Sequence, residues 1–300
     1  MPRSAALLQC SRWSKNLPRA VISRGKKIVK VNRVSLVTGG GRGIGRAIAL
    51  ALARSGTNVA VVSRTECELA ETVDLIKQKG GQATAFTADI SDADEVRRMA
   101  EEVSDRLGPV DVLVNCAGRA EPSGPVWNID AEAWWRCIEV NLRGPFLCTR
   151  AILPQMVTRG GGRIINITSG AALTSTPGAS AYSTSKTALV RFSEVVAHEA
   201  STYGVKVFSV NPGLVRTRLT ESFVQSEHAG KYSAWLCQSL KAGHDIPADR
   251  VANLVAFIAS GKADELSGCN IGVYSDISKI VSRAQEIQER ELFTLRLRIS

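Results

Sequence analysis

The chain lacks the patterns that mark disulfide-stabilised, zinc-binding and membrane-spanning proteins. Its seven cysteines are scattered without a CxxC pair, and none of its three histidines lies near a cysteine pair. These spacings predict neither a disulfide framework nor a metal site, and they favour a reducing compartment. No apolar run approaches the ~18 to 20 residues that a membrane span requires. With 44% hydrophobic and 22% charged residues, the 300-residue chain has the composition of a globular protein.

Acidic residues are absent from residues 1–33, which hold nine lysines and arginines. The formal net charge of +10 is therefore concentrated there, because the rest of the chain carries 29 basic and 28 acidic residues. A nearly neutral body argues against nucleic-acid binding. The basic extension, residues 1–30, fits a transit peptide, a disordered tail, a surface-binding arm or a start placed too far upstream. We expect a cytoplasmic location, or a mitochondrial one if the extension is a transit peptide.

From Val34 onward, apolar strand patterns alternate with amphipathic helix patterns over short connections. This alternation predicts an α/β fold, a Rossmann-like doubly wound parallel sheet with helices on both faces, in a single domain of residues 31–300. A helical stretch over 131–156 is interrupted near Asn141 and at Pro145, and Ser91 is predicted to cap the helix after the third strand. Seven strands rich in valine and isoleucine are expected at 34–39, 58–64, 83–90, 110–118, 162–169, 205–213 and 269–273.

Two segments stand apart from this alternation. Residues 216–246 form a long insertion of mixed character, which is typical of a lid or of a helical surface excursion. Its Phe223, Tyr232 and Trp235 predict a partly apolar pocket beneath it. The C-terminal extension, residues 277–300, begins with helical spacing and then alternates from Phe293, which predicts an edge strand pairing with this chain or with a partner subunit.

A glycine-rich turn, T-G-G-G-R-G-I-G over residues 38–45, follows the first strand and opens the first helix. Such a turn lets backbone amides and a helix N-terminus approach a pyrophosphate, although a purely structural tight turn is the alternative. After the second strand stands Ser63-Arg64 instead of the usual acidic residue, and Arg42 lies inside the turn. Two guanidiniums suit a 2′-phosphate, so the sequence predicts NADP(H) in preference to NAD(H).

Tyr182 and Lys186 form a YxxxK pair on one face of a predicted helix. A neighbouring ammonium favours the phenolate and lowers a tyrosine pKa that starts near ~10, which makes the residue a usable acid or base. Ser169 precedes this tyrosine by 13 residues, at the carboxyl end of the fifth strand. Ligands bind at those ends in open α/β sheets, so the three side chains form a candidate catalytic group.

These motifs, taken in order, resemble the short-chain dehydrogenase/reductase family, in its branch of single-domain oxidoreductases. The resemblance covers residues 33–274. Cys116 replaces the second asparagine of the family's NNAG motif, and the usual ending of valine, aspartate and two glycines is here Val273-Tyr-Ser-Asp. The matching elements are TGGGRGIG, Asp89, NCAG (115–118), Asn141, ITSG (167–170), YSTSK (182–186) and NPG (211–213).

The resemblance implies a role for each matching residue. Tyr182 would transfer the proton, Lys186 would lower its pKa and bind the nicotinamide ribose, Ser169 would hold the substrate oxygen, and Asn141 would anchor a proton-relaying water. The residues implied to bind the cofactor are Gly39, Arg42, Gly43, Ile44, Gly45, Ser63, Arg64, Asp89, Ile90, Asn115, Gly118, Tyr182, Lys186, Pro212, Gly213 and Thr217.

The sequence and the resemblance together predict an NADP(H)-dependent oxidoreductase that interconverts a carbonyl and a secondary alcohol. We expect a small substrate with an apolar portion and a homodimer or homotetramer. A 3-oxoacyl-thioester (acyl carrier protein) reductase is the alternative within the class, with Arg216 and Arg218 as the carrier patch. A catalytically silent dinucleotide-binding sensor or scaffold is the alternative of another class, because fold does not dictate function.

Overall fold

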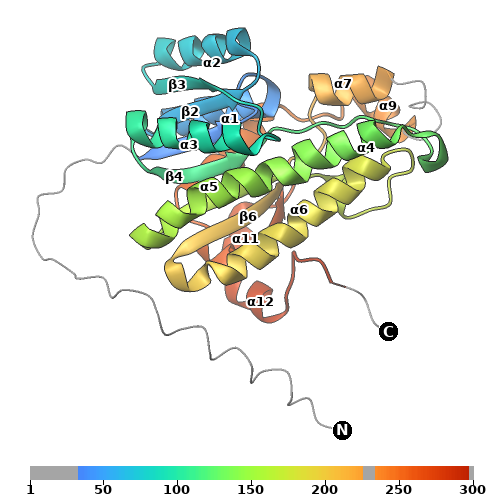
Figure 1. The fold of residues 1–300 in the computed structure, drawn as a ribbon. Coiled ribbons are helices and arrows are strands. Elements are labelled where there is room, and N and C mark those ends of the chain that lie inside the picture. The colour runs from blue at the N-terminus through green and yellow to red at the C-terminus, as the bar shows by residue number, and fades with distance from the viewer. Residues whose placement is uncertain (1–32, 226–233, 297–300) are drawn as a thin grey trace, which may run out of the picture. The chain divides into compact units, whose positions relative to one another are not determined.

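The computed structural model describes residues 33–225 and 234–296. In this part of the chain, seven parallel strands form one sheet, as predicted (Figure 1). The strand order is β3-β2-β1-β4-β5-β6-β7. The chain builds outward from β1 to one edge and then from β4 to the other, so the strand order reverses between β1 and β4. The strands are β1 (Val34–Thr38), β2 (Asn58–Ser63), β3 (Gln82–Thr87), β4 (Val110–Asn115), β5 (Gly162–Ile167), β6 (Val205–Asn211) and β7 (Asn270–Gly272).

Helices cover both faces of the sheet. Helices α1, α2 and α10 pack on one face and α3, α5 and α6 on the other, where they lie in front of the sheet in Figure 1. The helix bounds are α1 (Gly43–Arg54), α2 (Glu66–Gln78), α3 (Ala93–Leu107), α4 (Ala131–Ile138), α5 (Gly144–Arg159), α6 (Ser180–Glu199), α7 (Arg218–Gln225), α9 (Ala234–Lys241), α10 (Ala248–Ala259), α11 (Ile277–Val281) and α12 (Ala284–Glu289).

Two apolar cores hold these layers together. Successive strand residues point to opposite faces, so Leu36 belongs to the core under α3 and α5 whereas Val37 belongs to the core under α1 and α10. Ile164 and Ile165 divide in the same way, and all four side chains are fully buried. Burial on both faces explains why the strands read as continuous valine and isoleucine runs.

The long helical stretch is interrupted at the predicted place. Between α4 and α5 lies a π-helical turn, η2 (Glu139–Arg143), which contains the fully buried Asn141. The predicted break at Pro145 is wrong, because Pro145 lies in the first turn of α5. A proline is tolerated there since its missing N–H would have no partner within the helix.

The cap of α3 also differs from the prediction. Asp92 is the N-cap residue, and its Oδ1 accepts from Asp94 N and Glu95 N at 2.9 Å. Ser91 instead donates its hydroxyl to Asp89 Oδ1 at 2.6 Å. A carboxylate both pairs with the free amides and complements the positive end of the helix.

The C-terminal extension docks on its own domain. Its helical spacing is confirmed as α11 and α12, whereas the strand predicted from Phe293 is absent from the described residues up to 296. Glu291 and Phe293 have φ angles of 50° and 59°, which an extended strand does not allow. Asn270 N donates to Phe293 O at 2.8 Å and Leu295 N donates to Glu194 Oε1 at 2.7 Å, so the segment covers the outer edge of β7.

Several predicted features lie outside the described residues. These are the basic extension of residues 1–30, Tyr232 of the lid segment, and residues 297–300 of the C-terminal extension. Over residues 33–225 and 234–296, no helix combines the length and apolarity needed to cross a membrane.

Candidate active site

A cavity of about 1010 Å³ lies at the carboxyl ends of the strands. Because these ends meet at one edge of a parallel sheet, the loops that follow them converge on one place. The volume is at the upper limit of ordinary ligand sites, ~300 to 1,000 Å³, which leaves room for a long ligand. Six lining residues come directly after a strand, one for each of β1 to β6: Gly39, Arg64, Ala88, Cys116, Thr168 and Pro212.

The glycine-rich turn forms one wall of the cavity and is packed too closely for side chains. A Cβ at Gly45 would lie 2.1 Å from the carbonyl oxygen of Gly39. Gly39 itself has a φ of +68°, and a Cβ there would lie 2.8 Å from Ala117 Cα. Thr38 Oγ1 accepts hydrogen bonds from Cys116 N and Ala117 N at 3.1 and 3.2 Å, which ties the turn to the end of β4.

The first helix begins in this turn without a side-chain cap. Its N-cap residue, Arg42, accepts no capping hydrogen bond, and the first turn contains no acidic residue. Gly43, Ile44 and Gly45 line the cavity, so the uncapped end of α1 and the positive end of its dipole adjoin it. This arrangement has the features of a phosphate-binding helix N-terminus.

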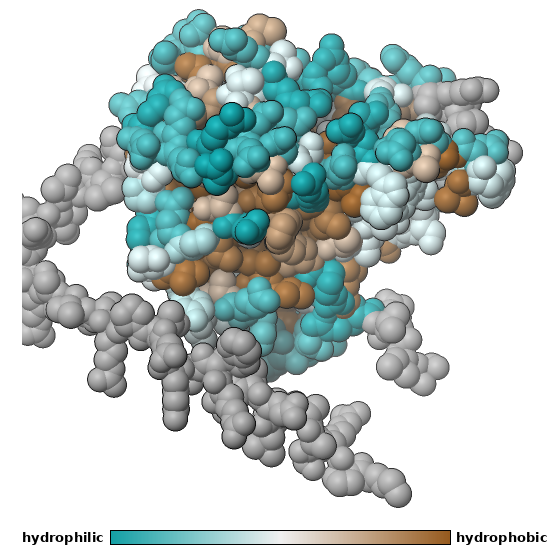
Figure 2. Space-filling model, viewed as in Figure 1, coloured by the Kyte–Doolittle hydropathy of each residue, from teal (hydrophilic) through white to brown (hydrophobic). Residues whose placement is uncertain are grey.

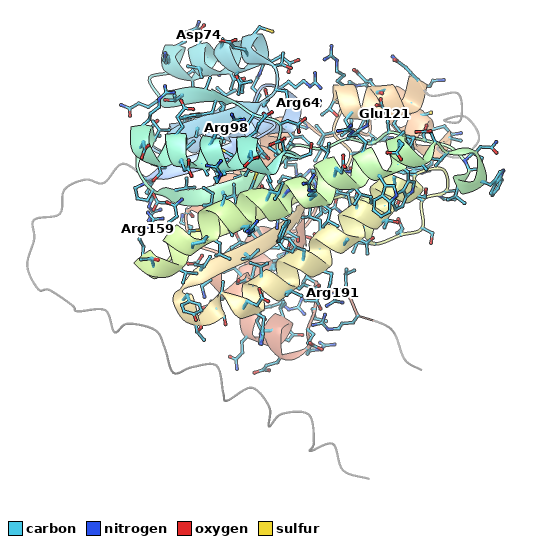
Figure 3. The ribbon with its side chains drawn as sticks, viewed as in Figure 1. Arg64, Asp74, Arg98, Glu121, Arg159 and Arg191 are labelled. Atoms are coloured by element: carbon cyan, nitrogen blue, oxygen red, sulfur yellow. The ribbon has the colours of Figure 1, made fainter. Side chains whose placement is uncertain are left out.

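Three of the five arginines that line the cavity pair with Glu68 or Asp89 at its polar rim. Arg42 Nη1 and Arg218 Nη1 lie 2.9 and 3.6 Å from the same oxygen, Glu68 Oε1. Arg64 Nη1 lies 3.6 Å from Asp89 Oδ2, and its side chain is 71% exposed (Figure 3). The rim therefore presents exposed cations whose partners are carboxylates of the same chain.

Asp89 and Ile90 line the cavity directly after β3. The Asp89 carboxylate accepts from Ser91 N at 2.9 Å in addition to the Ser91 hydroxyl. Burial raises the pKa of Asp89, but the two Ser91 hydrogen bonds and the Arg64 charge outweigh it and hold the pKa below its ordinary value. The residue is a fixed anion at the rim, and Ser63 lines the cavity beside it.

Ser169, Tyr182 and Lys186 come together at the other end of the cavity. Tyr182 and Lys186 lie on one face of α6, with Lys186 Nζ 5.9 Å from the tyrosine ring centroid. The ammonium donates to Ile167 O at 2.9 Å, at the carboxyl end of β5. Ser169 follows that strand, and its Oγ accepts from Ala171 N at 3.2 Å. All three line the cavity, so the spacing of the motifs predicted their proximity correctly.

The electrostatics of this group differ from the sequence expectation. Burial lowers the pKa of Lys186 to about 8. Burial also raises the pKa of Tyr182, although a hydrogen bond with Ser169 opposes the rise. The predicted lowering of the Tyr182 pKa by Lys186 is therefore not met in this structure. Desolvation is the largest cause of both shifts, because burial disfavours the charged form of each group.

Asn141 reaches the group from the π-helical turn. Its Nδ2 donates to Arg119 O at 2.7 Å and to Ser185 Oγ at 3.0 Å, while its Oδ1 accepts from Arg119 N at 2.8 Å. A Cβ on Gly118 would lie 3.4 Å from Asn141 Oδ1 and 3.6 Å from Lys186 Nζ. The asparagine thus joins α6 to the loop after β4, next to the lysine.

Asn115 lies beneath the cavity rather than on its wall. Its Nδ2 donates to Asn166 Oδ1 at 2.8 Å, and Asn166 donates in turn to Ser193 Oγ at 2.8 Å. Cys116, the residue that departs from the family motif, does line the cavity. Burial raises the pKa of its thiol to about 12, so it is a neutral, unreactive group.

The turn after β6 supplies a further wall. Pro212 and Gly213 line the cavity, and Gly213 has a φ of +67°. A Cβ there would lie 2.7 Å from Tyr274 Cε2, and the Tyr274 hydroxyl accepts from Leu214 N at 3.2 Å. Tyr274 comes two residues after β7 and also lines the cavity, so the altered C-terminal motif contributes directly to the site.

Part of the segment predicted as a lid or a surface excursion lines the cavity. Thr217 and residues of α7 and α9, Trp235 among them, form part of its lining. An apolar cluster of Ala120, Ala179, Phe223, Leu236 and Leu240 packs beside Tyr182. The side of the cavity next to the tyrosine is therefore apolar, whereas the side next to the glycine turn is charged.

The lining residues that the sequence did not single out as site residues include Arg119, Glu121, Arg136, Glu68 and Tyr274. Glu121 pairs with Arg119 at 3.4 Å and accepts a hydrogen bond from Ser222 of α7 (Figure 3). Glu68 and Tyr274 are close enough to the ends of β2 and β7 to be candidates by the carboxyl-end rule alone. Among the described residues, no three His, Cys, Asp or Glu side chains gather as a metal site would require.

Comparison with known proteins assigns the chain to a family. The sequence profile of the short chain dehydrogenase family matches residues 33–228. A short chain dehydrogenase from Pseudocercospora fijiensis is 35% identical over 263 residues, 85% of this chain and 84% of the relative. A 3-oxoacyl-(acyl-carrier-protein) reductase from Staphylococcus aureus is 36% identical over 246 residues, 82% of this chain and 98% of the relative.

Solved structures agree with this assignment. A variant of actinorhodin polyketide ketoreductase, crystallised with NADPH, superposes with a TM-score of 0.76 at 31% identity and covers 82% of this chain and 97% of its own. A gluconate 5-dehydrogenase from Burkholderia cenocepacia in complex with NADP and tartrate gives 0.73 at 29% identity, covering 82% and 95%. The chain belongs to the short-chain dehydrogenase/reductase family of oxidoreductases, and it has that family's Rossmann-like fold.

Proposed function

We propose that the protein is an NADP(H)-dependent oxidoreductase that interconverts a carbonyl group and a secondary alcohol. One observation carries the proposal: a single cavity joins an uncapped, glycine-rich helix end with two neighbouring arginines to a group made of the half-buried Ser169 and Tyr182 and the buried Lys186. The first end suits a phosphorylated dinucleotide and the second suits proton transfer to an oxygen. The family assignment supports this reading.

The residues present fit the cofactor. Glycine positions on the turn leave the backbone open, and the first-turn amides of α1 have no side-chain partner. Gly39, Gly43, Ile44 and Gly45 would hold the pyrophosphate. Arg42, Ser63 and Arg64 would hold a 2′-phosphate, Asp89 and Ile90 the adenine, and Gly118, Pro212, Gly213 and Thr217 the nicotinamide end, with Asn115 supporting the wall from beneath.

Bound NADP(H) would supply or accept the hydride, and the protein would move the proton. In reduction, the Tyr182 hydroxyl donates its proton to the substrate oxygen, and in oxidation the phenolate takes it back. The raised pKa of Tyr182 keeps this proton in place at neutral pH. Ser169, whose hydroxyl interacts with that of Tyr182, would hydrogen-bond the same oxygen and fix its position.

Lys186 supplies positive charge beneath the tyrosine. With its pKa lowered to about 8, the ammonium predominates at pH 7 and stabilises the phenolate as it forms. Asn141 holds Ser185 and the Arg119 backbone beside it, which fixes the relative positions of α6 and the β4 loop. We also assign to Asn141 the anchoring of a water that returns protons to the lysine.

The preference for NADP(H) rests on Arg42 and Arg64, because the residue after β2 is not acidic. The ketoreductase and the gluconate dehydrogenase described above were crystallised with NADPH and NADP. The nucleotides bound to these two proteins support NADP(H) as the cofactor of this chain.

A 3-oxoacyl-thioester reductase is the second candidate, favoured by the Staphylococcus aureus relative. The structure weakens the case for the carrier patch predicted from Arg216 and Arg218. Arg216 donates to Leu240 O at 2.6 Å and pairs with Asp245 at 3.2 Å, so it is engaged inside the lid segment. The apolar cluster under the lid instead suits a substrate with a hydrophobic portion.

The test is oxidation of NADPH at 340 nm with a panel of β-ketoacyl thioesters, ketosteroids, quinones, aryl ketones and sugars. Tyr182→Phe is expected to lower kcat at least a thousandfold while NADPH still binds, because the variant keeps the ring but lacks the proton. NADH serves as the cofactor control. Tight NADPH binding without turnover on any carbonyl would instead favour a silent sensor or scaffold.

An oligomer is part of the proposal. Apolar side chains gather over the face made by α5 and α6 (Figure 2), where Phe146 and Val195 are 44% and 46% exposed and Phe146 packs edge-on against Phe192. Exposed apolar patches of this kind mark association surfaces. We propose that this face joins two subunits in a homodimer or homotetramer.

A further inference from the structure

One carboxylate at the cavity rim pairs with two guanidiniums from segments that are distant in sequence. Glu68 Oε1 lies 2.9 Å from Nη1 of Arg42, which belongs to the glycine turn. The same oxygen lies 3.6 Å from Nη1 of Arg218, the first residue of α7. All three residues line the cavity, and the Glu68 side chain is 24% exposed.

The lid approaches the glycine turn at this point. A Cβ on Gly43 would lie 3.5 Å from Cγ2 of Thr217, the residue just before Arg218. A Cβ on Gly41 would lie 3.0 Å from Glu68 Cβ. The three charged groups therefore stand directly over the turn, and Arg218 is the one that comes from the lid.

We propose that Arg218 is a third ligand of the cofactor's 2′-phosphate and that Glu68 holds its place until the phosphate arrives. This inference rests on the proposed NADP(H) dependence. A 2′-phosphate displaces the Glu68 carboxylate from Arg42 and Arg218, and both guanidiniums then close on the phosphate.

The charges favour this exchange. A phosphate monoester carries about −1.5 to −2 charges at pH 7 and three acceptor oxygens, whereas Glu68 carries one charge and two oxygens. Arg42 and Arg218 are 52% and 74% exposed, so both are free to turn toward a new partner. A nucleotide without the 2′-phosphate leaves the Glu68 pairs intact, and it gains nothing from Arg218.

Calorimetric titration of the full chain with 2′,5′-ADP and with 5′-AMP measures the effect without turnover. The quantity of interest is the ratio of the two affinities, which isolates the 2′-phosphate. Arg218→Met is expected to lower this ratio about tenfold, the usual value of one charge-assisted hydrogen bond. Glu68→Gln is expected to raise it severalfold, because the competing anion is gone while the side-chain shape remains.

Arg216→Met is the matched control. It removes the same charge from the same segment, but its side chain binds Asp245 and Leu240 O rather than the rim. The ratio in this variant is expected to equal that of the unaltered protein. Circular dichroism of each variant checks that the fold is retained.

The outcomes separate this inference from the proposed function. A ratio near one in the unaltered protein would remove the NADP(H) preference itself. A high ratio that falls in Arg42→Met but stays unchanged in Arg218→Met would leave that preference standing and refute the role of Arg218. Equal weakening of both ligands in Arg218→Met would assign it to the 5′-phosphate and refute the 2′-phosphate assignment.

Discussion

Lys186 is a buried cation that donates to one backbone oxygen, Ile167 O. Burying its charge lowers the free energy of unfolding by an amount that depends on pH. Its pKa is about 8 in the folded protein and near ~10.4 in an unfolded chain. Between these values the unfolded chain binds a proton that the folded protein has lost, so the free energy of unfolding rises with pH. Below pH 8 the full penalty, about 3 kcal/mol, is present.

Lys186→Met is therefore expected to gain most in stability over the unaltered protein at pH 7 and to lose this advantage as the pH rises toward 10. Urea unfolding of both proteins across this range measures the difference. Lys79→Met, at an exposed position on the end of α2, controls for the change in net charge. A difference that stays constant with pH would contradict the buried ammonium.

Gly45 tests the packing of the glycine turn. A Cβ there would lie 2.1 Å from a backbone oxygen that cannot move without deforming the turn. Gly45→Ala is expected to cost about 1 to 3 kcal/mol of stability and to abolish nucleotide binding. Thermal unfolding and titration with NADPH are the two measurements.

Gly56→Ala is the control for this substitution. Gly56 has a φ of +83° but no heavy atom within 4 Å of a built Cβ. The change is expected to cost about 1 kcal/mol through backbone strain alone and to leave NADPH affinity unchanged. Equal effects of the two variants on NADPH affinity would show that crowding at Gly45 is not what matters.

The candidate catalytic side chains could be predicted because they depend on short spacings. Tyr182 and Lys186 share a helix face by periodicity, and Ser169 follows a strand whose end was recognisable. The pKa of Tyr182 could not be predicted, because burial beneath the lid outweighs a lysine whose Nζ lies 5.9 Å from the ring centroid. Glu68 was not predicted as a site residue, because its partner Arg218 is distant in sequence and only the fold brings the two side chains together.

Among the elements, the C-terminal segment makes the clearest prediction. Its backbone completes the outer edge of β7 through Phe293 O, and Leu295 N and Arg296 bind Glu194, which is only 9% exposed. Deleting residues 291–300 is expected to lower the free energy of unfolding by about 2 kcal/mol, because these hydrogen bonds are lost. The number of chains in the native assembly is expected to stay the same, since the segment binds its own chain.

Chemical denaturation and light scattering on the truncated protein measure these two quantities. Glu194→Gln is the milder companion variant, because it keeps the hydrogen bond from Leu295 N and weakens the Arg296 pair. A monomer produced by the truncation from a native oligomer would show instead that the segment pairs with a partner subunit.

Strands and long helices could be predicted from apolar periodicity, whereas the irregular segments could not, because they depend on individual contacts. The π-helical turn at Asn141 was visible only as an interruption. The apolar alternation from Phe293 resembled a strand, but positive φ angles at Glu291 and Phe293 bend the chain. The walls formed by 119–128 and 170–178 carried no pattern, because loop conformation depends on contacts such as that of Gly124 N with Gly178 O.

At the scale of the whole molecule, the apolar face of α5 and α6 predicts association. Phe146→Asp is expected to reduce the native mass to that of one chain, because a charge cannot be buried without a partner across the interface. Size-exclusion chromatography with light scattering measures the mass. Trp127→Asp changes a 78% exposed aromatic residue on the loop before α4 and is the control. Loss of association in both variants would show that the effect is not specific to the face of α5 and α6.

The cavity lies where the strands of the sheet end, and residues that follow each of β1 to β7 line it. Strand pairing in the sheet does not depend on what these loops contain, so a change in one loop alters one wall and leaves the scaffold intact. Selectivity is therefore open to stepwise engineering. Mutant libraries confined to 119–128, 170–178 and 234–246 would sample new substrates while the glycine turn and Tyr182 keep their positions.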